Sequence, residues 1–301
     1  MPRNPSRPAS PGKAAGPPDG TVDEETRGAG FGTFSGVFTP SILTILGVIM
    51  YLRFGWVVGN VGLWQTLIIV TICTSITALT ALSMAAIATD RQVETGGAYY
   101  MISRSLGVET GGAVGIPVYF ALAFSVALYT IGFAESVSRV FPAVPQTALA
   151  AVTTVVVAVL ALVSARLVIK AQYFILAAIG LSLVSFFFGG PLEATSLQLE
   201  PAANPEAGFW VVLAVFFPAV TGIEAGVNMS GDLKDPARSI PRGTLAALAV
   251  GYLVYMTLPV VLSVRADAQT LIDDPLVMRR MAFWGDAILL GVWGATLSSA
   301  M

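Results

Sequence analysis

The stretch 209–232, FWVVLAVFFPAVTGIEAGVNMSGD, is long and apolar enough to cross a bilayer, yet it carries Pro218, Gly222 and Glu224 at mid-membrane depth. Proline removes a backbone donor and glycine weakens a helix, so we expect the helix to be interrupted there. Interrupted backbone is tolerated inside a bilayer only where it is buried in protein or lines a watery cavity. The stretch therefore predicts a polar site within a helical membrane protein.

The first apolar stretch has the same character, with VFTP at 37–40 followed by TILGV at 44–48. The two interrupted stretches lie five spans apart, so they enter the membrane from opposite sides. This is typical of inverted-repeat transporters, in which two unwound helices face each other at the midplane and aim their dipole ends at an ion or small solute. We predict an all-α integral membrane protein with a five-plus-five inverted-repeat transporter fold and discontinuous helices 1 and 6.

Composition supports a membrane protein, because 55% of the 301 residues are hydrophobic and only 11% are charged, against about 25% charged in soluble domains. The last apolar span runs into Met301, so we expect the chain to end within helix 8. We expect residues 1–30 to form a disordered cytoplasmic tail and 31–301 the transmembrane domain. The eight candidate spans are 36–58, 63–88, 111–137, 146–164, 168–189, 209–230, 242–264 and 283–301.

Charge distribution predicts a multi-pass protein with a cytoplasmic N-terminus, because this orientation leaves most of the 16 Lys and Arg residues on the inner side. The polar segment 90–110 is expected to lie at the cytoplasmic interface, with a turn at Gly96 and Gly97. On the outer side this orientation places Arg53, Arg139, Arg265, Arg279 and Arg280.

The residue inventory argues against several other classes of protein. The chain has no histidine and a single cysteine, Cys73, in an apolar run, which gives no basis for a disulfide framework or a Cys-rich metal site. We therefore expect no cofactor and no enzymatic activity. The net charge of −2 gives no indication of a nucleic-acid partner. The expected partners are the lipid bilayer and inorganic ions, and a homodimer is left open.

Several side chains within spans have two interpretations each. Tyr129 is either a packing residue or a ligand, and Ser298 with Ser299 either permits close helix packing or binds sodium. Glu135 is either solvated or paired with Arg139 at i+4. Glu224 is the most informative, because a charge at the bilayer centre costs at least about 2.5–3.5 kcal/mol and normally faces a cavity or a partner.

Five segments resemble the cation–chloride cotransporters of the amino acid–polyamine–organocation superfamily. They are GTFSGVFTPSILTILGVIMYLRFGWVVGNVG at 32–62, GGAYYMISRSLG at 96–107, ALYTIGFAES at 127–136, VFFPAVTGIEAGVNMSGDLKDPARSIPRGT at 215–244 and GATLSSA at 294–300. The resemblance covers 32–301 and implies symport of chloride with potassium, sodium or both across the plasma membrane by alternating access.

The resemblance also implies site residues. Potassium would be held by the carbonyls of Thr44, Ile45 and Pro218 and the hydroxyls of Tyr129 and Thr221. Sodium would be held by the carbonyls of Leu43, Leu46 and Ala295 and the hydroxyls of Ser298 and Ser299, a serine pair that branches moving potassium without sodium lack. Chloride would lie on the N–H groups around Gly47, Val48 and Ile49, and a second chloride around Gly222, Ile223 and Glu224.

The chain departs from the family pattern at two of these positions. The animal members carry asparagine where this chain has Thr44 and an apolar residue where it has Glu224. Two alternatives to a chloride cotransporter stay open. One is a cation- or proton-coupled permease for amino acids or other organic solutes, with Glu224 pairing with a substrate ammonium. The other is a membrane scaffold subunit that carries no flux.

We expect Glu224→Gln and Glu224→Leu to change both the pH dependence and the chloride dependence of uptake. A carboxylate beside a chloride site repels the anion unless it is protonated, so this residue would replace one bound anion with a fixed or titrating negative charge. The measurement is uptake of a labelled cation over a series of pH values and chloride concentrations. Profiles identical to those of the unsubstituted protein would contradict the hypothesis.

Overall fold

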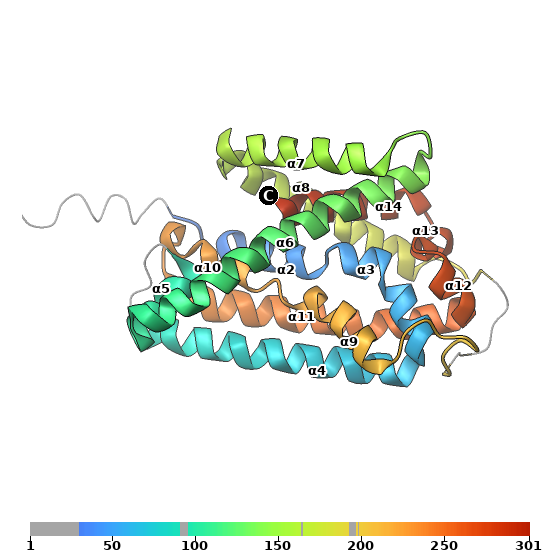
Figure 1. Cartoon of the computed structure of the whole chain (residues 1–301), viewed down its shortest axis with the longest axis horizontal. Coiled ribbons are helices and arrows are strands. Elements are labelled where there is room, and N and C mark those ends of the chain that lie inside the picture. Colours follow the sequence, from blue (N-terminus) through green and yellow to red (C-terminus); the bar gives the residue numbers. More distant parts are fainter. Residues whose placement is uncertain (1–29, 91–95, 164, 193–196, 198) are drawn as a thin grey trace, which may run out of the picture.

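The computed structural model describes residues 30–90, 96–163, 165–192, 197 and 199–301, and this part of the chain is built from helices (Figure 1). Residues 1–29 of the expected tail lie outside the described residues. Among those described, five helical segments are long and apolar enough to cross a membrane: Phe34–Leu52, Phe54–Asp90, Val108–Val140, Phe209–Asn228 and Pro236–Arg265. The predicted all-α membrane architecture is confirmed at this level.

The first apolar segment is divided into short helices. It begins as a π-helix, η1 (Phe34–Phe38), continues as α2 (Thr39–Ile45), and resumes as α3 (Val48–Leu52). Leu46 and Gly47, which we call the first interruption, are not helical: Leu46 has φ −80° and ψ 46°, and Gly47 is extended at φ −95° and ψ −152°. The first interruption therefore exposes carbonyls at the end of α2 and N–H groups at the start of α3.

The predicted first span, 36–58, is wrong at its outer end. The helix stops at Leu52, Arg53 forms a turn, and Phe54 starts the long helix α4 (Phe54–Asp90). A second bend lies inside α4 at Gly62, where φ is 73° and ψ is 175°. A side chain at Gly62 would place its Cβ 2.5 Å from the carbonyl oxygen of Leu199, so glycine is required by both the backbone angle and the close approach.

The sixth apolar segment is also divided. Helix α9 (Phe209–Phe216) tightens into a 3₁₀-helix, η2 (Phe217–Val220), and helical geometry resumes as α10 (Glu224–Asn228). Pro218 at the start of η2 has no N–H to continue the α-helical pattern. We call 221–223 the second interruption. A short 3₁₀ turn, η3 (Ser230–Asp232), then leads to α11 (Pro236–Arg265).

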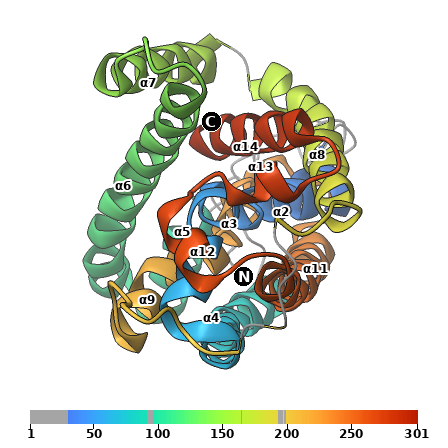
Figure 2. The same cartoon turned by 90° about the vertical axis from the view of Figure 1, so that its right-hand side faces the viewer.

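The first divided segment is enclosed by longer helices, whereas the second is only partly buried, with Trp210 in α9 76% exposed. In Figure 2, α2 and α3 lie near the centre, with α14 and α8 on one side, α4 and α11 on another, and α6 along the outside. The other long helices are α6 (Val108–Val140), α7 (Gln146–Val163), α8 (Ala165–Phe187) and α14 (Gly285–Ala300).

Glycines allow this close central packing. A Cβ at Gly226 in α10 would lie 2.7 Å from the carbonyl oxygen of Val37, and a Cβ at Gly251 in α11 would lie 2.7 Å from Cγ2 of Ile45. Small residues at helix contacts let backbones approach closely where no hydrophobic force distinguishes protein from lipid. The first divided segment is accordingly buried along almost its whole length, with Ile42, Leu43 and Met50 each at most 1% exposed.

At one end of the molecule, the flanks of the two divided segments are joined through the backbone. The N–H of Phe31 donates to the carbonyl of Asp232 at 2.8 Å, and the N–H of Lys234 donates to Phe31 at 3.0 Å. Helix α5 (Gly97–Leu106), within the segment expected at the interface, lies at this end (Figure 1). It follows a turn in which Gly96 and Gly97 have φ of 129° and 54°.

The opposite end carries the short helices α12 (Ala268–Asp273) and α13 (Val277–Met281) (Figure 1). The turn after α3 also carries a charge cluster. The Arg53 guanidinium donates to both carboxylate oxygens of Glu135 at 3.1 and 2.7 Å, and Arg139 approaches the same carboxylate at 3.5 Å. The predicted pair of Glu135 with Arg139 at i+4 is present, and the expectation of a solvated Glu135 is corrected. The principal partner is Arg53, which the turn after α3 brings to α6.

We expect Glu135→Gln to lower the free energy of unfolding by about 1–2 kcal/mol, because it removes the charge that satisfies a partly buried guanidinium while keeping the size of the side chain. Thermal unfolding of the purified protein in detergent measures the change. The control is Asp286→Asn, since Asp286 is largely exposed and lies 3.5 Å from Arg279, and such pairs contribute about 0–1 kcal/mol. Equal effects of the two substitutions would show that the Arg53 contact adds nothing.

Candidate functional site

The second interruption touches the end of α2, directly before the first interruption. A Cβ at Gly222 would lie 2.6 Å from Cβ of Thr44 and 3.0 Å from the backbone nitrogen of Ile45, so the second interruption packs directly on the end of α2. The Ser41 hydroxyl donates to the carbonyl of Ile223 at 3.3 Å, which adds a polar link between α2 and the second interruption. Two stretches that lie about 180 residues apart in sequence thus form one polar centre between helices.

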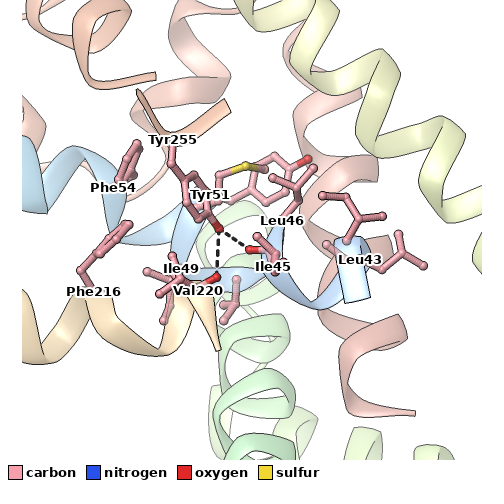
Figure 3. Close-up of a cluster of buried hydrophobic side chains, with 14 of the residues drawn as sticks. Leu43, Ile45, Leu46, Ile49, Tyr51, Phe54, Phe216, Val220 and Tyr255 are labelled. Carbon is pink, nitrogen blue, oxygen red and sulfur yellow. Dashed lines mark hydrogen bonds between the residues drawn. The ribbon is translucent and has the colours of Figure 1, made fainter. Parts of the chain in front are cut away.

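A tyrosine that the sequence analysis did not single out connects both sides of this centre. Tyr255 in α11 is fully buried, and its hydroxyl donates to the carbonyl of Ile45, with the carbonyl of Ala219 at 3.4 Å (Figure 3). Ile45 is the last residue of α2, and Ala219 lies in η2. A tyrosine inside an apolar span needs a partner for its hydroxyl, and that general signal could have identified this residue.

The residues expected to hold potassium fall into two groups. Thr44, Ile45, Pro218 and Thr221 are brought together where the end of α2 meets the second interruption. The Thr221 hydroxyl donates to the carbonyl of Pro218 at 2.9 Å, and the Thr44 hydroxyl turns back to the carbonyl of Pro40 at 2.9 Å.

The remaining potassium candidate, Tyr129, comes from α6. It is 9% exposed and belongs to the same buried cluster as the residues of α2 and α3. It lies one turn before Gly132, where a Cβ would meet the side chain of Val48 in α3. This close approach places Tyr129 on the helix that flanks the first interruption.

The residues expected to hold sodium come together between α2 and α14. The Ser299 hydroxyl donates to the carbonyl of Leu43 at 3.4 Å, and a Cβ at Gly47 would lie 3.6 Å from the same hydroxyl oxygen. Leu46 belongs to the first interruption itself, and Ala295 lies one turn before Ser299 on α14 and is fully buried.

Ser298 is the most informative of the sodium candidates. It is 6% exposed, and within the described part of the chain its buried hydroxyl oxygen has no hydrogen-bond partner. A buried hydroxyl without a partner costs about 1–3 kcal/mol, so such an atom calls for a ligand. Ser298 lies on α14 next to Ser299, whose hydroxyl donates to the carbonyl of Leu43 in the first divided segment.

The residues expected to hold chloride lie at the starts of two short helices. Gly47, Val48 and Ile49 form the first turn of α3, where N–H groups have no acceptor within the helix. Gly222 and Ile223 precede α10, and Glu224 is its first residue and is half-buried. The centre thus presents carbonyls, hydroxyls and amides together, a combination that can hold cations and anions side by side.

A second buried tyrosine, Tyr51, joins α3 to α8. The Tyr51 hydroxyl lies 2.5 Å from the Ser182 hydroxyl in α8, and a Cβ at Gly291 in α14 would lie 2.5 Å from the same tyrosine oxygen. Tyr51 therefore joins α3 to α8 through side chains, whereas Tyr255 bonds to the backbone of the interrupted segments.

Comparisons with known proteins identify the family of the chain. The sequence profile of the amino acid permease family matches residues 36–301. The chain is similar to solute carrier family 12 member 9 of Danio rerio, at 34% identity over 322 residues that cover 89% of this chain and 36% of that protein. It is similar to solute carrier family 12 member 8 of Mus musculus, at 34% identity over 287 residues, 90% of this chain and 41% of that protein.

A third relative has a name that describes its substrates. The chain is 35% identical over 338 residues to the bumetanide-sensitive sodium-(potassium)-chloride cotransporter of Manduca sexta. The alignment covers 91% of this chain and 32% of that protein. The chain spans 32% to 41% of the length of these three relatives.

We expect Gly222→Ala to lower the free energy of unfolding by about 1–3 kcal/mol, because the added methyl group would overlap Thr44 and the backbone of Ile45. The control is Gly180→Ala in α8, where a Cβ would meet nothing within 4 Å. There the change is expected to be neutral or stabilising by up to about 1 kcal/mol. Thermal unfolding in detergent measures both variants. A Gly222→Ala protein as stable as the control would show that the interruptions do not pack as described.

Proposed function

The chain belongs to the amino acid permease family, in its cation–chloride cotransporter branch, and we propose that it is a secondary active transporter that moves chloride together with potassium, sodium or both. The single observation that carries the proposal is the contact of Gly222 with Thr44 and Ile45, because it joins the carbonyl end of α2 and the second interruption in one polar centre. A chain that only spans the membrane has no use for such a centre.

The proposed mechanism is alternating access in the plasma membrane. Under it, the described helices belong to a five-plus-five inverted repeat, with the segments around the two interruptions as helices 1 and 6. The end that carries Phe31 and α5 would face the cytoplasm, and the end that carries Arg53 and Glu135 would face outward. Support comes from the Lys and Arg bias of the sequence, since positive residues favour the cytoplasmic side.

The proposed cation sites use the two faces of α2. Potassium would lie between the end of α2 and η2, on the carbonyls of Thr44, Ile45 and Pro218, with hydroxyls from Thr221 and Tyr129. Support comes from the Gly222–Thr44 contact, which brings the two carbonyl-bearing segments together.

Sodium would lie on the opposite face, between α2 and α14. Its ligands would be the carbonyls of Leu43, Leu46 and Ala295 and the hydroxyls of Ser298 and Ser299. The partnerless hydroxyl of Ser298 and the Ser299–Leu43 contact favour this site over simple packing of the serine pair.

The proposed anion sites use the amide ends of α3 and α10. One chloride would lie on the N–H groups of Gly47, Val48 and Ile49. At the second position, Glu224 would supply a fixed or titrating negative charge in place of a bound anion. The same amides could hold the carboxylate of an amino acid, with Glu224 pairing with its ammonium. An organic-solute permease is therefore the second candidate, favoured by Glu224 and by the match to the amino acid permease family.

We expect rubidium uptake into cells expressing the complete reading frame to fall to background when chloride is replaced by gluconate. Uptake that ignores chloride but is inhibited by an amino acid would favour the permease. A correctly inserted protein with no flux would favour a scaffold subunit.

Sodium dependence tests the serine pair. If sodium stimulates this uptake, Ser298→Ala should raise the half-saturating sodium concentration by about tenfold, since a polar contact to a charged group is worth about 1.5–3 kcal/mol. The matched control is Thr296→Val on the same helix, whose buried hydroxyl donates to the carbonyl of Val292 at 2.7 Å. If both substitutions leave sodium dependence unchanged, the serine pair has only a packing role.

A further inference from the structure

We propose that the hydroxyl of Tyr255 holds the end of α2 and the η2 turn in register and thereby sets the affinity of the cation site between them. The inference rests on the proposed function for its substrate and on the structure for its geometry. Tyr255 is a positioning residue here, because it acts through the backbone of Ile45 and Ala219 and not by contact with the transported ion.

The first support is the identity of the acceptors. The hydroxyl has one proton and gives it to the carbonyl of Ile45, while the carbonyl of Ala219 is the more distant acceptor at 3.4 Å. These carbonyls belong to the two halves of the site, the end of α2 and the η2 turn. One buried atom therefore touches both discontinuous segments from a third helix, α11 (Figure 3).

The second support is the way in which the ring is fixed. The Tyr255 ring packs against Phe54 with centroids 5.5 Å apart and against Phe216 at 5.6 Å, and these two rings are 5.4 Å from each other. Phe54 is the first residue of α4, and Phe216 is the last residue of α9. The three rings form a buried cluster beside the site, so the position of the hydroxyl is set by packing as well as by its hydrogen bond.

The third support is the close approach of α11. Gly251 lies one turn before Tyr255, and a Cβ there would lie 2.7 Å from Cγ2 of Ile45. The absence of a side chain at Gly251 lets α11 come near enough for Tyr255 to reach the carbonyl of the same residue. Two neighbouring turns of α11 thus hold Ile45, one by shape and one by a hydrogen bond.

The effect of this hydrogen bond on ion binding depends on how many partners a carbonyl oxygen can accept. A carbonyl oxygen has two lone pairs, so one can accept the Tyr255 proton while the other faces a cation. The hydrogen bond holds the carbonyl in one direction before the ion arrives, which reduces the cost of ordering the site on binding. Without the hydroxyl, the carbonyls of both segments are freer to turn away, and the cation should bind more weakly.

The test compares Tyr255→Phe with Tyr51→Phe in the protein expressed from its complete reading frame. Each substitution removes one buried hydroxyl and keeps the ring, but the Tyr51 hydroxyl bonds to Ser182 and not to the interrupted backbone. For Tyr255→Phe, we expect the half-saturating rubidium concentration to rise about five- to tenfold, the effect of losing one hydrogen bond near a charged ligand. Half-saturating chloride should change less than twofold, and Tyr51→Phe should change neither value more than twofold.

A purely structural role would lower the maximal rate and the amount of folded protein in both variants without changing the rubidium half-saturation selectively. That result, or equal half-saturation shifts in the two variants, would overturn the inference.

A second measurement does not depend on transport. Hydrogen exchange of the purified full-length protein in lipid nanodiscs should be faster in Tyr255→Phe over 42–49 and 217–224, and unchanged there in Tyr51→Phe. Unchanged exchange in Tyr255→Phe overturns the inference whether or not uptake is seen. If the unsubstituted protein takes up no rubidium in a chloride-dependent way, the proposed function fails, and the cation-affinity part of the inference fails with it. If the unsubstituted protein shows chloride-dependent uptake and Tyr255→Phe has the same half-saturating rubidium concentration, the proposed function stands and only this inference fails.

Discussion

The need to satisfy every backbone polar group within a membrane is the constraint on which the rest of this structure depends. A helix that stops inside a bilayer exposes carbonyls and amides that lipid cannot bind, at a cost of several kcal/mol per group. Here the second interruption packs on the end of α2, beside the first interruption. The Gly222–Thr44 contact, the Ser41–Ile223 hydrogen bond and the Tyr255 hydroxyl supply packing and partners that a lone interrupted span would lack.

Close packing of small residues makes this arrangement possible. Gly226, Gly243 and Gly251 each face the first divided segment at distances where a methyl group would not fit. The same feature gives the site its chemistry, since it brings carbonyl ends, amide ends and hydroxyls into one buried volume. Structure and proposed function therefore share a cause, because the interruptions release backbone groups from helical hydrogen bonds and place them beside side chains of other helices.

The corrections to the sequence-based predictions have a common origin in contacts between distant segments. The first span was expected to continue to residue 58, because 54–58 are apolar, but Arg53 pairs with Glu135 of α6 and the chain turns there. Tyr255 was missed because its surroundings in sequence are those of an ordinary apolar helix. Its importance comes from reaching Ile45, 210 residues away. In both cases the decisive partner lies on another helix, where hydropathy along one segment gives no information.

The sequence by itself determined the class of protein and the places where its helices weaken. Apolar length requires membrane-crossing helices, and proline and glycine within such stretches disfavour regular helical geometry, both for reasons local to the segment. Only the tertiary structure decided which groups meet there: that Gly222 packs on Thr44, that Ser299 reaches Leu43, and that Tyr255 joins Ile45 to η2. These contacts depend on how closely distant helices approach, which is set by the whole set of packed side chains and not by the composition of any one segment.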